Sequence, residues 1–111
     1  MNWIALQSEE ELNTIKEKSF TKPQVIFKHS TRCSISSMAK NRLDKSNTSP
    51  DVDFHYLDLI KFRGLSNKIA EVYQVYHESP QVLLIKNGEC IYDESHSGID
   101  AQEIIEHAMA A

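Results

Sequence analysis

The chain has 111 residues, of which 41% are hydrophobic and 25% charged, with a formal net charge of −4. These values are typical of a soluble globular protein, and the length favours a single domain over residues 1–111. A net negative charge with both signs interspersed argues against a nucleic-acid partner. No apolar run reaches membrane-spanning length, and the early glutamates Glu9–Glu11 do not fit a signal peptide.

Two cysteines, Cys33 and Cys90, occur without an export signal. This pattern favours a reducing, cytoplasmic location, where thiols take part in chemistry more often than they form structural disulfides.

The first half of the chain predicts two strand–helix units. Residues 3–6 favour a short strand, and Ser8 with Glu11 forms a capping box that begins a helix. Residues 24–29 have an apolar centre that predicts a buried strand. A turn follows, and apolar residues then recur at helical spacing, which predicts a helix over residues 34–45. Its inner face would carry Ile35, Met38, Ala39 and Leu43.

The second half predicts a loop over residues 46–51, a strand over residues 52–59 and a further helix. The inner stripe of that helix would carry Leu65, Ile69, Val72 and Tyr73. Residues 81–86 predict the best-defined strand, and Asn87-Gly88 is a strong hairpin signal because both positions tolerate positive φ. The partner strand covers residues 89–94, and a last helix capped at its start by Asp100 carries Ile104, Ile105 and Ala108.

The resulting order is βαβαβαββα. Strands that alternate with helices and end in a hairpin indicate an α/β fold with a mixed, mostly parallel sheet. We expect one antiparallel edge, and helices on both faces of the sheet.

Cys33 is the candidate reactive residue because it lies where a buried strand passes into a helix. Free amides and the helix dipole stabilise an anion at that position, and the thiolate is the reactive form of cysteine. Arg32 adds a fixed positive charge, whereas Lys40 and Arg42 lie too far along the helix to contribute much. The alternative is an inert buried cysteine, which the polar and basic neighbours disfavour.

Cys90 follows the hairpin in mid-strand, where a small buried hydrophobe is the favoured interpretation. A resolving or redox-sensing thiol is the alternative, and it would require Cys33 and Cys90 to approach within disulfide distance.

Two further features are weaker signals. Ser79-Pro80 precedes a central strand, where both a cis bond and an ordinary trans proline are open. The five histidines show no metal-ligand spacing, so we expect no metal site. His29 is nearest to Cys33 and could serve as a base, although a strand-end histidine facing solvent is the commoner case.

Residues 69–73 and 79–89 closely resemble the second half of a thioredoxin, including the cis-proline site and the closing hairpin. Gly98 matches the small residue of the loop that lines the substrate groove. The resemblance extends from about residue 24 to residue 108. It implies a thioredoxin-like three-layer αβα sandwich and a cis bond at Ser79-Pro80.

The departures from thioredoxins concern the two-thiol machinery. Thioredoxins carry Cys-x-x-Cys at this turn, whereas Ser36 stands in place of the second, resolving cysteine. They also place a buried aspartate six residues before the first cysteine, where this chain has Phe27. Both changes suit a protein that forms a mixed disulfide and cannot resolve it internally.

The segment over residues 28–36, Lys-His-Ser-Thr-Arg-Cys-Ser-Ile-Ser, resembles the monothiol bacilliredoxins of Gram-positive bacteria that use bacillithiol in place of glutathione. The resemblance implies removal of bacillithiol from S-bacillithiolated client proteins by Cys33. It implies no bound cofactor, bacillithiol as co-substrate, and a separate downstream reductant. The expected substrate-binding residues are Thr31, Arg32, Ser34, Ser36, Ser79, Pro80, Gly98 and Ile99.

Within that set, Arg32 could pair with a carboxylate of the bacillithiol malate unit. Free amides of the turn over residues 97–100 could bind another carboxylate. The Ser79 backbone would offer strand-like hydrogen bonds.

Three other functions remain open at this level. One is an iron–sulfur carrier like the monothiol glutaredoxins with Cys-Gly-Phe-Ser, although Ser34 replaces the glycine. Another is a non-enzymatic interaction module, which predicts an unactivated Cys33. The third is a two-thiol switch that uses Cys90.

Overall fold

The computed structural model describes residues 1–46 and 49–110. Its elements follow the predicted order, with ends that differ from the expected ones by one or two residues. They are β1 (Trp3–Ala5), α1 (Glu9–Lys18), β2 (Gln24–His29), α2 (Ser34–Asp44), β3 (Asp53–Asp58), α3 (Arg63–Tyr73), β4 (Gln81–Lys86), β5 (Glu89–Ser95), the short 3₁₀ turn η1 (His96–Gly98) and α4 (Ala101–Met109). Part of the loop expected over residues 46–51 lies outside the described residues.

The local signals of the sequence are borne out at both ends of the fold. The Ser8 hydroxyl accepts from the Glu11 amide at 3.2 Å and begins α1. Asn87 and Gly88 both have positive φ in the β4–β5 hairpin, as a turn of this length requires. The Asp100 carboxylate accepts from the Glu103 amide at the start of α4.

The sheet has the strand order β1-β3-β2-β4-β5 and is mixed, as predicted. β1, β3 and β2 are parallel, while β4 runs antiparallel to both β2 and β5. Both β2–β4 and β4–β5 are therefore antiparallel pairs, whereas we expected antiparallel pairing at one edge of the sheet only. The reason is that α3 ends at Tyr73 and its C-cap Gln74 is in the left-handed conformation. Residues 74–80 then lead to a strand that starts beside Lys28, near the C-terminal end of β2.

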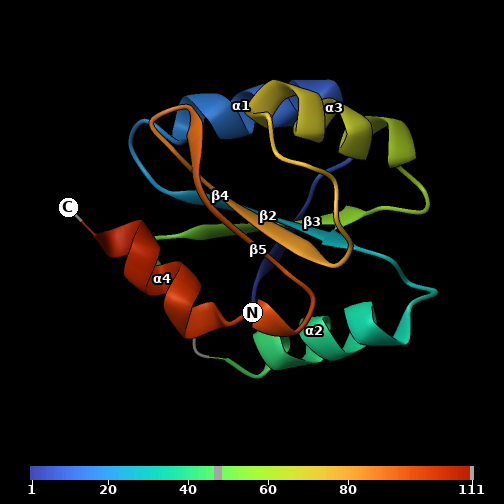
Figure 1. The fold of residues 1–111 in the computed structure, drawn as a ribbon. Helices are drawn as coiled ribbons and strands as arrows, with labels where there is room; N and C mark the ends of the chain where they lie inside the picture. Colours follow the sequence, from blue (N-terminus) through green and yellow to red (C-terminus); the bar gives the residue numbers. More distant parts are fainter. Residues whose placement is uncertain (47–48, 111) are drawn as a thin grey trace.

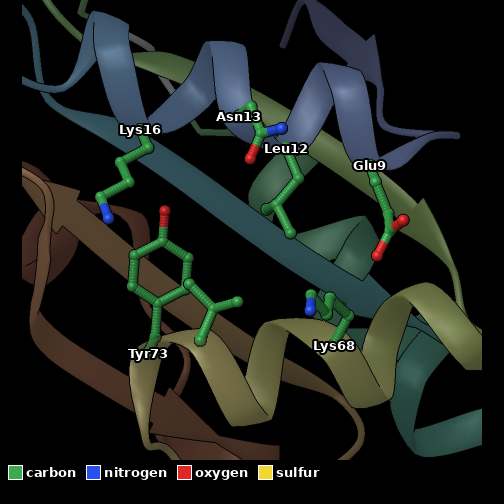
Figure 2. A pocket seen from close by; sticks show the side chains of 7 residues that line it. Glu9, Leu12, Asn13, Lys16, Lys68 and Tyr73 are labelled. Atoms are coloured by element: carbon green, nitrogen blue, oxygen red, sulfur yellow. The ribbon is translucent and has the colours of Figure 1, made fainter.

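Helices cover both faces of the sheet, with α1 and α3 on one side and α2 and α4 on the other (Figure 1). Side chains of a strand alternate between faces, so Val25 and Phe27 of β2 join the core beneath α2 and α4, and Ile26 joins the core beneath α1 and α3. On the α1/α3 side, Leu12 and Tyr73 project from the two helices toward one another (Figure 2).

Two predicted helix faces are partly wrong. Ile35 and Met38 of α2 are 53% and 61% exposed, and the buried face is instead Ser36, Ala39 and Leu43. On α3, Val72 is 41% exposed and Ser66 is buried in its place. Both errors have one cause, because a serine that finds hydrogen-bond partners can occupy a buried position that hydrophobicity alone assigns to another residue.

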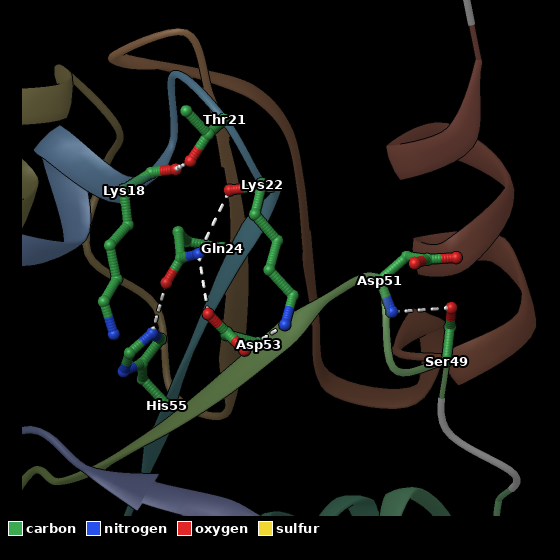
Figure 3. A network of polar contacts seen from close by, with 8 residues as sticks. All are labelled: Lys18, Thr21, Lys22, Gln24, Ser49, Asp51, Asp53 and His55. Carbon is green, nitrogen blue, oxygen red and sulfur yellow. Dashed lines mark hydrogen bonds and ion pairs between the residues drawn. The ribbon is translucent and has the colours of Figure 1, made fainter.

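A network of hydrogen bonds and one ion pair connects side chains at the N-terminal ends of β2 and β3 (Figure 3). The Gln24 side chain meets His55 Nε2 at 2.7 Å and donates to Asp53 at 2.9 Å, and Lys22 forms an ion pair with Asp53 at 2.9 Å. His55 is buried, and burial lowers the pKa of its ring to about 4. The ring is therefore neutral at pH 7.

This network predicts a pH dependence of stability. Because the folded-state pKa of His55 lies below its ordinary value of 6.5, the unfolded chain binds a proton first as the pH falls, and stability is lost from about pH 6.5 toward pH 4. Between pH 7 and pH 5 the native protein should lose about 2 kcal/mol more than a His55→Gln variant. Urea unfolding at the two pH values measures this, with the exposed His107→Gln as control. Equal losses in native protein and His55→Gln would contradict the assignment.

Candidate active site

Cys33 is the N-cap residue of α2 and is a free, partly exposed thiol. Its amide donates to the Ser30 carbonyl at 3.2 Å, and its own carbonyl accepts from the Ser37 amide at 3.0 Å. The first amides of a helix have no partner within it. The sulfur therefore lies at the positive end of α2, where the sequence placed it.

The Ser36 hydroxyl, fully buried, connects the turn to the end of β2. It lies 2.6 Å from His29 Nδ1 and accepts from the Ser30 amide at 3.0 Å. His29 is 4% exposed, so the expectation that it faces solvent is wrong: α2 covers it. Burial, followed by the Lys40 ammonium, lowers the pKa of His29. The neutral His29 ring and the Ser36 hydroxyl thus fix the residues before Cys33 through buried hydrogen bonds.

Phe27 is fully buried at the position where thioredoxins have an aspartate. Its ring stacks on Trp3 at 5.5 Å and on His29 at 5.7 Å. Beneath α2, the Phe27 ring therefore takes the place of the carboxylate of a two-thiol protein. The Ser36 hydroxyl takes the place of its second sulfur.

Pro80 lies beside the Cys33 turn because β2 and β4 are paired. Lys28 pairs with Gln81, which brings Pro80 level with His29 across the ladder. The Ser79-Pro80 bond is cis, as the thioredoxin resemblance implied. The Pro80 carbonyl accepts from the His96 amide at 3.0 Å, and this contact joins the proline to η1.

Residues 96–99 reach the same end of the sheet and are held there by Arg42. Its guanidinium donates to the carbonyls of His96 at 3.3 Å and Ile99 at 3.4 Å. Sequence reasoning set Arg42 aside as too distant from Cys33; its role is to fasten this segment to α2. Gly98 has little room, since a Cβ there would lie 2.7 Å from the Glu94 side chain.

The predicted substrate-binding residues thus come from three segments at one end of the sheet, but they are not equally accessible. Thr31, Arg32, Ser34 and Gly98 are exposed and Ser79 is partly exposed, whereas Ser36, Pro80 and Ile99 are buried. The Ile99 amide donates to the His96 carbonyl at 3.4 Å. Ligand contacts by any of these residues stay predictions.

Lys28 is a buried polar residue whose role the sequence reasoning missed. It is fully buried, and its ammonium donates to the Ser66 carbonyl at 3.3 Å and lies 3.4 Å from His77 Nδ1. Burial lowers its pKa to about 8. A lysine inside a strand covered on both faces is the signal that could have revealed it. It connects β2 to the loop that leads to Pro80.

Comparisons with known proteins agree with this geometry. The family model described as monothiol bacilliredoxin BrxC matches residues 4–104. The chain belongs to the monothiol bacilliredoxin family. A solved structure described as a proposed oxidoreductase with a thioredoxin fold is 32% identical, covers 93% of this chain and 90% of its own, and has a TM-score of 0.81.

Two thioredoxins share the fold at lower identity. The thioredoxin Mala s 13 of Malassezia sympodialis is 18% identical, covers 96% of this chain and 91% of its own, and has a TM-score of 0.75. Oxidised thioredoxin O2 of Arabidopsis thaliana is 23% identical, covers 95% and 90%, and has a TM-score of 0.69. These two structures show that this bacilliredoxin has the thioredoxin-like αβα sandwich. Its family and the 32% identical structure make it a thiol redox protein. Over the described residues, no helix is long and apolar enough to cross a membrane.

Cys90 lies at the opposite end of the bacilliredoxin sheet from Cys33. It pairs with Ile85, which pairs with Gln24 at the start of β2, whereas Cys33 lies beyond the end of that strand. At about 3.3 Å per residue, the separation exceeds the reach of a disulfide. Cys90 packs against the α1/α3 core, and burial raises the pKa of its thiol to about 11.

The two thiols should therefore differ sharply in reactivity. At pH 7.5 roughly one Cys90 in several thousand is a thiolate at the pKa given above, so iodoacetamide should label Cys33 first and leave Cys90 largely unmodified in the folded protein. Peptide mapping by mass spectrometry over time measures both sites. Faster labelling of Cys90, or an internal disulfide under mild oxidation, would contradict this and favour the two-thiol switch.

The Ser36 hydroxyl should also stabilise the fold. Ser36→Ala leaves His29 Nδ1 and the Ser30 amide without their buried partner, which should lower the free energy of unfolding by about 1–3 kcal/mol. Urea unfolding measures the loss, and Ser37→Ala on the same helix is the matched control. If Ser36→Ala costs no more than Ser37→Ala, the hydroxyl does not hold the turn.

Proposed function

We propose that this bacilliredoxin removes bacillithiol from S-bacillithiolated proteins through a mixed disulfide on Cys33. The Cys33 thiolate attacks the bacillithiol sulfur, a new Cys33–bacillithiol disulfide forms, and the original disulfide breaks. The client thiolate leaves with the electron pair of that bond and takes a proton from water. A second thiol, either bacillithiol or a separate reductase, then releases Cys33 by a further exchange.

The observation that carries this proposal is the replacement of the two-thiol machinery beside Cys33. Ser36 and Phe27 occupy the positions of the resolving cysteine and the buried aspartate, and both are fully buried. A hydroxyl cannot displace the bound thiol from Cys33 by disulfide exchange. The mixed disulfide therefore persists until a second molecule attacks it, which is what a carrier of a small thiol requires.

We assign recognition of the bacillithiol carboxylates to Arg32. It is exposed and directly precedes Cys33, so its guanidinium can reach a malate carboxylate in a charge-assisted contact. The amides of residues 97–100 are weaker candidates. The Ile99 amide already donates within the turn, and the Asp100 carboxylate occupies the start of α4.

A protein client also needs a surface to contact near the sulfur. Ile35 and Met38 of α2 follow Cys33 closely in the sequence and are more than half exposed. Exposed apolar side chains next to a reactive group are typical of interaction surfaces. They support a client protein, in addition to a free small thiol, as the substrate.

The proposal predicts release of bacillithiol that depends on Cys33. Incubation of a bacillithiolated client with the native protein should return the client to its unmodified mass and leave bacillithiol on Cys33. Intact-mass spectrometry measures both products. Cys33→Ser should abolish release, and the matched Cys90→Ser variant should retain it. Release by Cys33→Ser at the native rate would overturn the proposal.

The release experiment and a reconstitution experiment separate the rival functions. An interaction module would bind clients without releasing bacillithiol. For an iron–sulfur carrier, the residues that the structure describes contain no group of three or more potential metal-ligating side chains, so no observation within this chain favours it. Anaerobic reconstitution that gave the absorption of a cluster would reverse that conclusion.

A further inference from the structure

Two buried side chains of the sheet hold the loop over residues 74–80, which leads from α3 to β4 (Figure 1). Lys28 of β2 and Gln81 of β4 are ladder partners, and both are almost fully buried. The Gln81 side-chain amide donates to the Tyr76 carbonyl at 2.9 Å and accepts from the Glu78 amide at 3.4 Å. One member of this ladder pair thus fixes the loop backbone at two places.

Lys28, the other member of the pair, holds the residue between those two places. Its ammonium lies 3.4 Å from Nδ1 of His77 and donates to the Ser66 carbonyl of α3 at 3.3 Å. The Ser66 hydroxyl lies 3.3 Å from the same ring nitrogen. An ammonium can only donate, so Nδ1 accepts and the neutral His77 ring carries its proton on Nε2. A protonated ring would turn a second donor toward the ammonium, and the contact would be lost.

Lys28 costs the folded protein stability. Burial lowers its pKa from 10.5 to about 8, so stability is reduced at pH 7 and returns as the pH rises from 8 toward 10.5. Removal of the ammonium would strand neither of its partners. The Ser66 carbonyl lies within α3, where the helix supplies an amide donor, and His77 is exposed to water. A residue that costs stability while it fixes a loop is typical of a functional region.

The path from His77 to the reactive end of the sheet is short. Ser79 is two residues further along the chain. Between them, Glu78 pairs with His96 at 3.1 Å, and the His96 amide donates to the Pro80 carbonyl at 3.0 Å. A change in the position of the His77 ring is therefore transmitted to the segment that lies level with the end of β2.

We propose that Lys28 is a positioning residue for disulfide exchange at Cys33, because through His77 it holds the loop that places the Ser79 backbone beside the bound thiol. This inference rests on the proposed function and on the strand-like hydrogen bonds expected of Ser79. Lys28 touches neither the sulfur nor the ligand. It acts by limiting the conformations of the loop, and a small misplacement of a group that orients a substrate slows its reaction strongly.

His77→Ala is the first test, because His77 is exposed and its loss leaves the core intact. Release of bacillithiol from a client should slow about fivefold or more. Alkylation of Cys33 by iodoacetamide should keep its rate, since this small reagent needs no contact with the loop. A general loss of structure would change both rates. His107→Ala, at an exposed histidine of α4, is the matched control and should change neither.

Lys28→Met is the second variant, since it removes the ammonium and keeps an unbranched apolar side chain. It should slow release to the same extent as His77→Ala, while its melting temperature equals or exceeds that of the native protein. Slower exchange in a protein of equal or greater stability separates positioning from a structural role.

The pH profile gives a further readout that a structural role would not change. The charged and titratable side chains around His77 come from β2, α3, η1 and its own loop, namely Lys28, Arg63, His96 and Glu78. Burial, then the Lys28 and Arg63 charges, lower the pKa of His77 below 6.5, against the opposing effect of Glu78. The ring is therefore neutral at pH 7 and leaves Lys28 only in acid.

His77→Asn keeps an oxygen acceptor close to the position of Nδ1 and cannot titrate, so it should retain most of the release rate at pH 7.5. The ratio of native to His77→Asn rates cancels the ionisation of Cys33. This ratio should be near one at pH 7.5 and fall below about pH 6, where the native ring gains its proton.

Four results would overturn this inference: native release rates in His77→Ala and Lys28→Met, equal slowing of alkylation, a lower melting temperature of Lys28→Met, or a constant native-to-His77→Asn ratio between pH 7.5 and pH 5. Failure of the native protein to release bacillithiol would instead overturn the proposed function. The same variants are therefore also compared in exchange with a glutathionylated peptide, whose rate tests the loop without bacillithiol.

Discussion

The complete burial of β2 is the constraint on which the rest of the structure depends. All six of its residues are buried, because α1 and α3 cover one face of the sheet and α2 and α4 cover the other. A polar side chain on this strand must find a partner inside the protein, since an unsatisfied buried group costs about 1–3 kcal/mol. Gln24 meets His55 and Asp53, Lys28 meets Ser66 and His77, and His29 meets Ser36. Each of these sets of contacts connects β2 to a different element, namely β3, α3 and α2.

The chemistry of the site follows from the last of these contacts. Because Ser36 satisfies both His29 and the Ser30 amide, the position that a dithiol protein gives to its resolving cysteine here performs a structural task. Family membership and this arrangement agree in that the turn after Cys33 carries a buried hydroxyl where a dithiol protein has its second sulfur. The sulfur lies at the start of α2, and Ser36 and Phe27 on the buried side of the turn supply neither a second thiol nor a carboxylate.

Much of the fold was predictable from the sequence, because its signals are local. Apolar runs, the Ser8 and Asp100 caps and Asn87-Gly88 are fixed by neighbours in the chain, and they marked the elements within one or two residues. The position of Cys33, where a strand passes into a helix, was predicted on the same basis, whereas its reactivity stays a prediction. The cis state of Ser79-Pro80 came from family resemblance and could not be decided by local chemistry.

The errors concern residues whose environment comes from distant parts of the chain. His29 was expected to face solvent, but α2 packs over it. Ile35 and Met38 were expected to be buried, but Ser36 takes the inner position because a histidine seven residues earlier offers it a hydrogen bond. Arg42 was set aside because its partners, the carbonyls of His96 and Ile99, lie more than 50 residues away. Hydrophobic periodicity along the sequence gives no information on contacts of this kind.

The position of β4 between β2 and β5 has a consequence for how bacilliredoxins of this kind can change. Pro80 lies level with His29, at the end of β2 that leads to Cys33, because Gln81 and Lys28 share a ladder position. The position of the proline is therefore set by strand register. In the loop over residues 74–80 the Tyr76 side chain is 94% exposed, whereas His77 is held by Lys28 and the Tyr76 carbonyl accepts from the Gln81 side chain. A change of the Tyr76 side chain leaves thiol and proline in place, but a one-residue slip of β4 turns every side chain on the strand to the opposite face. The exposed position is thus free to diversify toward new partners, while β4 is held to a single alignment.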